Sequence, residues 1–327
     1  MRLGLVGYGS IAEYHFDALN SIGREAPRGE RLQDEDAGIR WRSVVGRLAA
    51  PTEEFARRYG FEQQSTDLDA ALGDPELDAV VVTSPTDLHF EHVEKCLLAG
   101  KHVLAEIPLA TSLAEADRLA ALAAAAGLCL MVCHTQRYYP AFAEARRRVA
   151  AGELRVQHII YRHTYFRRDT VNWRGRRRTW PDNLLWHHGA HVVDAALWIL
   201  GATEVEVAGF VARPAPPLDI PMDLGLVVRT PLGQLVTVAM SYNDRLPVNE
   251  CLVIGEEETL LVRDGRLSTR DGVVYAPPEG EGNIRQAIVE QDREFLAAVR
   301  EARSPAIDAA AVRPAMTVLQ AAQDWGR

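Results

Sequence analysis

Three histidines stand close together in the second half of the chain, at His187, His188 and His191. In a helix, His187 and His191 are four residues apart and share one face, while His188 is offset by one residue. Histidine titrates near neutral pH and can remove the proton of a hydroxyl group. Asp194, three residues after His191, could orient an imidazole. We therefore predict that the three histidines are catalytic or bind substrate, with a structural role as the alternative.

The same histidine spacing could bind zinc, but no third ligand at a suitable spacing is evident in the sequence. We therefore expect no metal site.

Arginines crowd into the segment before these histidines. They are interleaved with aromatic residues, and the cluster comprises Arg162, Tyr165, Arg167, Arg168, Trp173, Arg174, Arg176, Arg177, Arg178 and Trp180. The planar guanidinium group matches a carboxylate in a bidentate geometry, so the cluster suits a small anionic substrate. Tyr165, Arg167 and Arg168, near the end of an expected strand, are candidate substrate ligands, and Arg137 is another. The arginines at 174–178 fit a solvated loop or a subunit contact.

A glycine pattern lies near the amino terminus. Gly7, Gly9 and Ala12 fit G-x-G-x-x-G/A between an apolar run and a helical pattern. The first glycine permits a tight turn, the second lets the backbone approach a pyrophosphate, and the alanine allows close packing of the helix. We predict that the loop, with Ser10 and Ile11 at the start of the helix, binds a dinucleotide.

The end of the second expected strand bears on the choice of cofactor. An enzyme that prefers NAD usually has an acidic residue here, which binds the ribose hydroxyls. This chain has Gly46 and Arg47 instead, and an arginine can pair with a 2′-phosphate. We therefore expect NADP as the cofactor, with NAD and a surface role for Arg47 as the alternatives.

Strand and helix patterns alternate in the first part of the chain. Apolar runs at 2–6, 41–45, 77–82, 102–105 and 128–133 alternate with helical patterns at 10–22, 51–59, 89–98 and 113–126. This order is typical of a doubly wound parallel sheet. Residues 24–38 are polar, fit neither period, and are expected to form a surface insertion.

The pattern changes after about residue 134. Strand-like runs at 157–166, 205–213, 224–230, 234–242, 251–254 and 259–263 are separated by short turns, as in a meander of hairpins. A helical pattern at 184–200 interrupts these strands, and helical patterns at 286–302 and 308–323 end the chain, the last expected to begin or break at Pro314. We expect an α/β protein: a dinucleotide-binding Rossmann domain at 1–134 and an α+β domain at 135–327 for substrate binding and oligomerisation.

The composition excludes several classes of protein. The chain has 327 residues and a formal net charge of −9, which disfavours a nucleic-acid partner. It lacks a signal-peptide pattern and any run of about 20 apolar residues, so we expect a cytoplasmic protein without a membrane partner. Its four cysteines, Cys96, Cys129, Cys133 and Cys251, are expected to be buried thiols in a reducing compartment.

Several motifs together resemble the Gfo/Idh/MocA oxidoreductase family. They lie at 7–12 with His15, at 83–86 with His89, at 99–103 running into Glu106-Ile107-Pro108, and at 189–194. The resemblance implies nicotinamide-dependent chemistry, an open-faced and mainly antiparallel second sheet, and a homodimer or homotetramer. It also implies that Thr83, Pro85, His89 and Glu106 belong to the cofactor site.

Two positions depart from the usual family pattern. Most members have a lysine that assists proton transfer where this chain has Ile107, and members acting on sugars often have an aspartate where it has His187. The segments 106–110, 134–138, 164–168 and 184–188 instead resemble one branch, the 4-carboxy-2-hydroxymuconate-6-semialdehyde dehydrogenases of bacterial aromatic degradation. That resemblance implies NADP-dependent oxidation of a cyclic hemiacetal to 2-pyrone-4,6-dicarboxylate. The alternatives are a sugar or cyclitol dehydrogenase and an inactive dinucleotide-sensing protein.

Overall fold

The computed structural model describes residues 1–24, 38–172, 174–178, 180–181, 183–278, 280 and 282–325. It divides into two compact units, Met1–Cys133 with Arg285–Ala311, and His134–Ile284 with Val312–Arg327. The expected insertion lies, apart from its ends, outside the described residues, as does Trp173.

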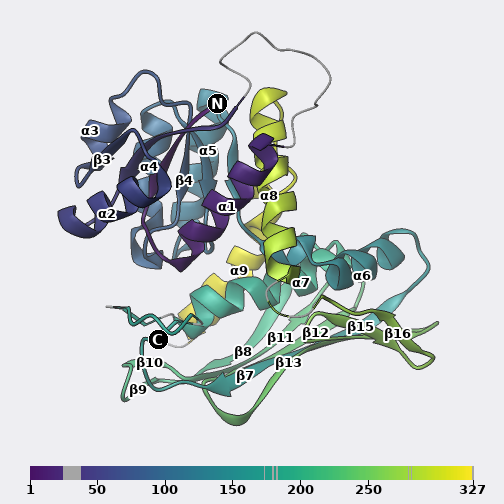
Figure 1. Ribbon diagram of the computed structural model, residues 1–327. Coiled ribbons are helices and arrows are strands. Elements are labelled where there is room, and N and C mark those ends of the chain that lie inside the picture. Colours follow the sequence, from purple (N-terminus) through teal and green to yellow (C-terminus); the bar gives the residue numbers. More distant parts are fainter. Residues whose placement is uncertain are drawn as a thin grey trace. The chain divides into compact units, whose positions relative to one another are not determined.

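The first unit contains a six-stranded parallel sheet, which confirms the predicted Rossmann fold (Figure 1). The order is β3-β2-β1-β4-β5-β6. The strands are β1 (Arg2–Val6), β2 (Arg40–Val45), β3 (Gln63–Ser65), β4 (Ala79–Val82), β5 (His102–Ala105) and β6 (Leu130–Val132). The order reverses between β1 and β4, and a dinucleotide binds at the carboxyl ends of the strands at such a switch point.

Helices connect these strands. They are α1 (Ser10–Arg24), α2 (Ala49–Tyr59), α3 (Leu68–Leu72), the 3-10 turn η1 (Thr86–Leu88), α4 (His89–Leu98) and α5 (Leu113–Ala126). The predicted elements of this unit are present, whereas the short β3 and α3 were not expected. The segment Gln63–Ser65 is polar and gives no apolar period.

A late segment of the chain returns to the first unit. Helix α8 (Gly282–Arg300) places Asp292 against His15 of α1, and the backbone N–H of Val132 donates to the carbonyl of Ile307 at 2.9 Å. Residues 285–311 therefore group with the first unit, although the sequence placed them in the second domain. These contacts join residues far apart in the chain, which a local pattern does not reveal.

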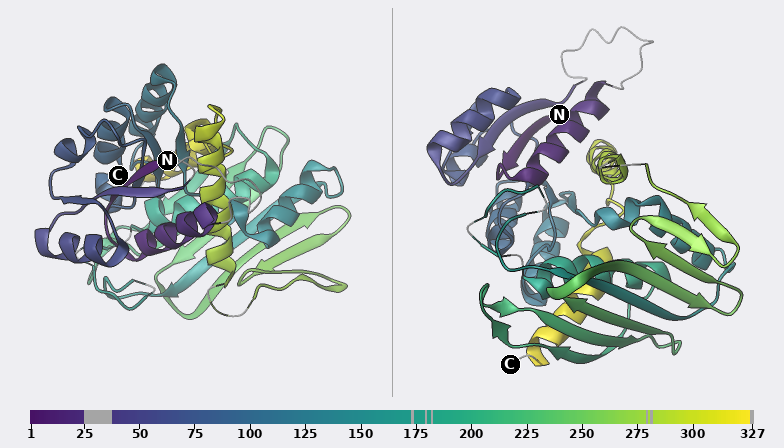
Figure 2. Two further views of the ribbon diagram at one scale, coloured as in Figure 1. Left: turned by 45° about the horizontal axis from the view of Figure 1, so that its top comes forward. Right: turned by 60° about the horizontal axis from the view of Figure 1, so that its bottom comes forward.

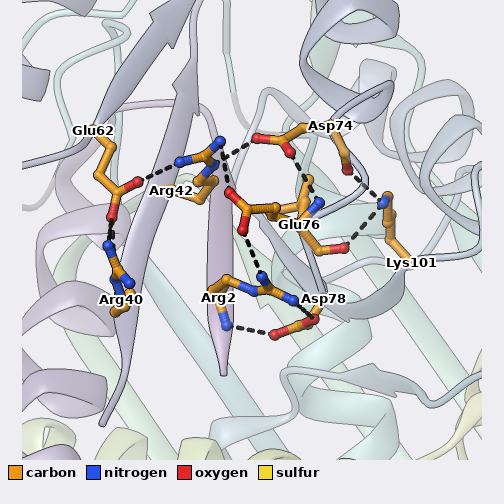
Figure 3. A network of polar contacts seen from close by, with 9 residues as sticks. Arg2, Arg40, Arg42, Glu62, Asp74, Glu76, Asp78 and Lys101 are labelled. Atoms are coloured by element: carbon orange, nitrogen blue, oxygen red, sulfur yellow. Dashed lines mark hydrogen bonds and ion pairs between the residues drawn. The ribbon is translucent and has the colours of Figure 1, made fainter. Parts of the chain in front are cut away.

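A network of charged side chains lies at the amino-terminal ends of the strands of this sheet (Figure 3). The Lys101 ammonium donates to the backbone carbonyls of Asp74 and Leu77, at 2.9 Å each, and Arg42 pairs with Asp74 at 2.6 Å. Lys101 therefore holds the loop before β4. These contacts give Lys101 a structural role. The carboxyl-terminal ends of the strands, on the other side of the sheet, are where a dinucleotide binds.

The second unit contains an eight-stranded sheet in the order β16-β15-β14-β13-β7-β12-β11-β8. The strands are β7 (Val156–Phe166), β8 (Glu206–Val211), β11 (Asp223–Arg229), β12 (Leu235–Ser241), β13 (Asn243–Gly255), β14 (Thr259–Arg263), β15 (Arg266–Thr269) and β16 (Gly272–Tyr275), and β9 (Pro214–Ala215) pairs separately with β10 (Ile220–Pro221). The mainly antiparallel sheet is confirmed. The simple meander is corrected, because β7 lies between β12 and β13 and runs parallel to β12.

One face of this sheet carries helices. They are α6 (Pro140–Ala150), which was not predicted, and α7 (Gly189–Leu200), with the short turns η2 (Thr135–Tyr138) and η3 (Leu184–His188) beside them (Figure 1). Residues alternate between buried and exposed along β11, as expected for a sheet with one open face. Figure 2, right, turns that face toward the viewer.

The last helix, α9 (Ala309–Trp325), runs through Pro314, so the expected start or break at this proline is wrong. The loss of one backbone hydrogen bond is tolerated because Val312, Ala315 and Met316 around it are buried. Within the described residues, no helix has the length and apolar character needed to cross a membrane.

Candidate active site

The glycine loop lies between β1 and α1, as predicted. Gly7 has a φ of +96°, and a Cβ atom there would lie 2.7 Å from the carbonyl oxygen of Thr83, so only glycine fits. A Cβ on Gly9 would meet nothing within 4 Å, which leaves the backbone open to a ligand. Ser10 and Ala12 are buried in the first turn of α1, and Ile11 is half-buried. The loop therefore fits a pyrophosphate at the amino terminus of a helix.

The end of β2 has no room for an acidic side chain at Gly46. A Cβ on Gly46 would lie 2.2 Å from the ring of Tyr8 and 2.4 Å from Oγ1 of Thr52, so an aspartate does not fit there. Arg47 is exposed and makes no hydrogen bond or ion pair with the described residues. Its guanidinium group is therefore not held by another side chain of the described residues.

Hydrogen bonds join the loop after β4 to the loop after β5. Oγ1 of Thr83 donates to the carbonyl of Val6 at 3.1 Å, next to the glycine loop. His89 is buried, and its ring nitrogens lie 2.7 Å from the carbonyl of Pro108 and 2.8 Å from that of Ser84. Pro85 lies in the same loop as Ser84 and directly precedes η1. Thr83 and His89, predicted at the cofactor site, thus shape these loops through backbone contacts.

Glu106 follows β5 and belongs to a buried group of ionisable side chains. His15 lies between two carboxylates, with Nε2 at 3.0 Å from Oε1 of Glu106 and Nδ1 at 2.9 Å from Oδ2 of Asp292. Cys133 approaches Nε2 of His15 at 4.0 Å. Ile107, next to Glu106, is buried.

In the second unit, the three predicted histidines lie at the junction of η3 and α7. The turn η3 is π-helical, and Asn183 caps it by accepting hydrogen bonds from the backbone N–H groups of Leu185 and Trp186. Such a turn is common at functional sites. The rings of His187 and His191 are 6.1 Å apart, and those of His187 and His188 are 4.7 Å apart. The structure therefore brings the three histidines together.

His188 contacts two tyrosine hydroxyl groups. Its Nδ1 lies 2.5 Å from Oη of Tyr242, and its Nε2 lies 3.3 Å from Oη of Tyr165. Burial, reinforced by His187, His163, His191 and Arg167, lowers the pKa of His188 well below its usual range. A neutral His188 donates to one tyrosine and accepts from the other. This ring therefore links two hydroxyl groups.

Two further histidines join the cluster. The ring of His163, on β7, stacks on His188 at 5.1 Å, and its Nδ1 lies 3.3 Å from Oδ1 of Asn249. The ring of His134 lies 6.4 Å from that of His191. His134, His163 and Tyr242 are not among the site residues predicted from the sequence. His163 shares a strand face with Tyr165, so the two-residue period could have identified it.

Asp194 contacts an imidazole, as expected, and this imidazole belongs to His134. Its Oδ2 lies 3.1 Å from Nδ1 of His134, and its two oxygens accept hydrogen bonds from Arg137 at 2.9 and 2.6 Å. Burial alone raises the pKa of Asp194, but His134 and Arg137 hold it well below its usual range. Arg137 is thus already paired with a carboxylate, which weakens it as a substrate ligand.

The other arginine candidates differ in their surroundings. Arg167 is buried, its NH1 lies 3.4 Å from Oη of Tyr165, and its guanidinium lies 5.5 Å from the ring centre of Tyr242. Arg168 is exposed and donates to the backbone carbonyls of Arg167 and Tyr242. Arg167 therefore joins the histidine cluster, whereas Arg168 holds the backbone.

The remaining basic residues make other contacts or are exposed. Arg162 pairs with Glu250 on the neighbouring strand, and Arg178 lies 4.7 Å from the ring centre of Trp180. Arg174, Arg176 and Arg177 are exposed, in keeping with a solvated loop.

A Rossmann sheet with a glycine loop, together with a second unit holding clustered histidines, defines a class of two-part dinucleotide-binding oxidoreductases. Residues 1–134 match the family model described as the oxidoreductase family with an NAD-binding Rossmann fold. Residues 140–273 match the model for the C-terminal part of bacterial oxidoreductases.

Two curated relatives give the similarity in more detail. The chain is 34% identical over 322 residues to 4-carboxy-2-hydroxymuconate-6-semialdehyde dehydrogenase of Sphingobium sp., covering 98% of this chain and 96% of the relative. It is 30% identical over 169 residues to the scyllo-inositol 2-dehydrogenase (NADP(+)) of Bacillus subtilis, covering 51% of this chain and 47% of that one. The chain belongs to the Gfo/Idh/MocA family of oxidoreductases.

Solved structures share the fold. Levoglucosan dehydrogenase, in complex with NADH and levoglucosan, superposes with a TM-score of 0.83 at 20% identity, covering 99% of this chain and 96% of that one. At this identity the similarity describes the fold alone.

Proposed function

We propose that this chain is an NADP-dependent dehydrogenase that oxidises the cyclic hemiacetal of a carboxylated semialdehyde. The substrate we propose is 4-carboxy-2-hydroxymuconate-6-semialdehyde, which would yield 2-pyrone-4,6-dicarboxylate. The observation that carries the proposal is the histidine cluster of the second unit, with two tyrosines and the buried Arg167 beside it. The near full-length similarity to the Sphingobium enzyme supports it.

The cofactor side of the proposal rests on the first unit. Gly7 and Gly9 fit the pyrophosphate, the helix α1 begins beside them, and Arg47 is available for a 2′-phosphate. When bound, the nicotinamide supplies the two-electron acceptor for the reaction.

The proton of the hemiacetal hydroxyl needs a base. Ile107 occupies the position of the usual family lysine and cannot ionise, so we assign this role to the histidines. His191 is our candidate base, and His187 acts beside it. His188, held between Tyr165 and Tyr242, keeps the cluster in place and can pass a proton between their hydroxyl groups.

The substrate carboxylates need a cation. Arg167 has a guanidinium that is buried beside Tyr165 and Tyr242, and a buried arginine binds a carboxylate in a charge-assisted, directional manner. A neutral polyol offers no charge to pair with it. This is why we favour a carboxylated substrate over a sugar.

The test is an assay of a panel of substrates with NADP⁺, in which the near-ultraviolet absorbance of NADPH measures the reaction. It compares the carboxylated semialdehyde with an analogue lacking the ring carboxylate, with scyllo-inositol and with D-xylose. We expect efficient reduction of NADP⁺ only with the dicarboxylated substrate. Faster oxidation of a polyol would instead identify a sugar or cyclitol dehydrogenase. Dinucleotide binding without turnover of any member of the panel would favour a sensing protein.

A further inference from the structure

Three ionisable residues, two buried and one partly exposed, lie in a row in the first unit. We call Asp292, His15 and Glu106 the acid–histidine–acid row. His15 and Asp292 have side chains that are 0% exposed, and that of Glu106 is 14% exposed. They come from α8, from α1 and from the residue after β5. Three distant parts of the sequence therefore meet at one hydrogen-bonded row.

The geometry of the row favours a protonated His15. Both nitrogens of His15 face carboxylate oxygens, at 3.0 Å for Glu106 and 2.9 Å for Asp292. When both carboxylates are ionised they can only accept hydrogen bonds, so His15 then donates at both ends as an imidazolium. Burial lowers the pKa of His15, but Asp292 and Cys133 more than reverse this and hold it well above its usual range. Burial also raises the pKa of Asp292, and the contact with His15 opposes that rise. In this protonation state the row carries one net negative charge.

The charge at the exposed end of the row is fixed in place. Oε1 of Glu106 accepts from His15, and Oε2 accepts from the backbone N–H of Ile107 at 3.2 Å. Glu106 follows β5, on the β4 side of the switch point between β1 and β4. In such a sheet the adenosine half of a dinucleotide lies on the β2 side, so Glu106 lies on the nicotinamide side.

This placement has a consequence for the two forms of the cofactor. The nicotinamide ring is a cation when oxidised and neutral when reduced, so a fixed anion nearby interacts differently with the two forms. We propose that Glu106, held by His15 and Asp292, strengthens the binding of the oxidised dinucleotide relative to the reduced one. The inference rests on the proposed use of NADP, and it assigns Glu106 to cofactor discrimination and His15 and Asp292 to its positioning.

The test measures the dissociation constants of NADP⁺ and NADPH by calorimetry, without substrate. Glu106→Gln keeps an acceptor for His15 and removes the charge. We expect the ratio Kd(NADPH)/Kd(NADP⁺) to fall about tenfold in this variant, the size expected for one unit charge acting at intermediate dielectric. An unchanged ratio would overturn the proposal.

A matched control uses the same two helices. Asp17 of α1 and Arg285 of α8 form an exposed ion pair at 3.3 Å, away from the buried row. Asp17→Asn should leave the ratio at its wild-type value. A fall equal to that of Glu106→Gln would show a general electrostatic effect and contradict the role of Glu106.

The positioning residues are tested by a pH profile. The titratable groups facing His15 are Asp292 on α8, Glu106 after β5 and Cys133 after β6, and burial keeps the Cys133 thiol neutral by raising its pKa. In Asp292→Asn the imidazolium loses a partner charge, so His15 should titrate and the ratio should rise from pH 6 to pH 8, whereas the wild-type ratio stays level. A level ratio in this variant would remove Asp292 and His15 from the proposal, and Asp292→Glu should restore the wild-type profile.

A metal ion is the competing explanation, because ligand atoms of His15, Glu106 and Cys133 lie within 4.8 Å of one another. Dialysis of the wild type against a chelator should leave the ratio unchanged. A change after dialysis would replace the fixed charge with a metal site. If the wild type binds neither dinucleotide, the proposed function fails. If it binds both and Glu106→Gln keeps the ratio, only this inference fails.

Discussion

Single residues decide which protonation states the histidine cluster can use. Burial lowers the pKa of His163 and, with the neighbouring histidines, that of His188. Both rings are therefore neutral at physiological pH and suit proton transfer between uncharged groups. If these rings were imidazolium ions at the same spacing, their positive charges would repel one another.

The lowered pKa values predict how stability depends on pH. In the unfolded chain, His163 and His188 take up protons near the ordinary value of 6.5, but in the folded chain only at lower pH. The free energy of unfolding should therefore fall as the pH drops from 6.5 toward the lowered values. Urea unfolding at a series of pH values from 7 to 5 measures this, and His188→Gln should flatten the dependence. An equal slope in this variant would show that other groups cause it.

Arg47 gives the second prediction at the residue scale. Arg47→Asp should weaken NADP⁺ binding by about tenfold or more, because a charge-assisted hydrogen bond contributes about 1.5–3 kcal/mol. NAD⁺ binding should change much less. Calorimetry with both dinucleotides measures this, and Arg57→Asp, an exposed site on α2, is the control. Tighter binding of NAD⁺ than of NADP⁺ by the wild type would contradict the expected preference.

At the scale of elements, the π-helical turn η3 determines where the histidines lie. Asn183→Ala removes the side chain that caps Leu185 and Trp186, so we expect a loss of about 1 kcal/mol in stability. We also expect a lower kcat with unchanged NADP⁺ affinity. Ser112→Ala, which removes the cap of α5 in the first unit, should cost similar stability without this loss of turnover. Equal kinetic effects of the two variants would show that the turn has no specific role.

The elements also show what could be predicted from the sequence. The glycine loop, α5 and β14 follow from local residue patterns, and the structure places them where these patterns indicate. The insertion of β7 between β12 and β13 depends on long-range pairing, and the contact of Tyr242 with His188 joins residues 54 positions apart. Asp292 likewise meets His15 only after 277 residues of separation. Contacts of this kind leave no local signal.

At the scale of the whole molecule, we propose that the open face of the second sheet binds another copy of the chain. Phe210 on β8 is 82% exposed and Val227 on β11 is 42% exposed, on the face opposite to the helices. Exposed apolar side chains on a broad sheet favour association. We expect a homodimer or homotetramer by light scattering at micromolar concentration.

Charge placed on that face should disrupt the assembly. The double variant Phe210→Glu with Val227→Glu is expected to shift the protein toward monomer. Leu232→Glu, at an equally exposed site in the turn between β11 and β12, should not. A wild-type protein that is monomeric at micromolar concentration would refute the proposed assembly.

The central claim is that the histidine cluster, rather than a lysine, takes the substrate proton. Steady-state turnover of the carboxylated semialdehyde by His191→Ala tests it most directly, with His158→Ala as the control. His158 lies on β7 and contacts Thr237, outside the cluster. Positioned proton transfer contributes about 100- to 10,000-fold in rate, so we expect a loss of this size in His191→Ala with NADP⁺ affinity nearly intact, and near-normal turnover in His158→Ala. Near-wild-type turnover by a folded His191→Ala variant would contradict the assignment.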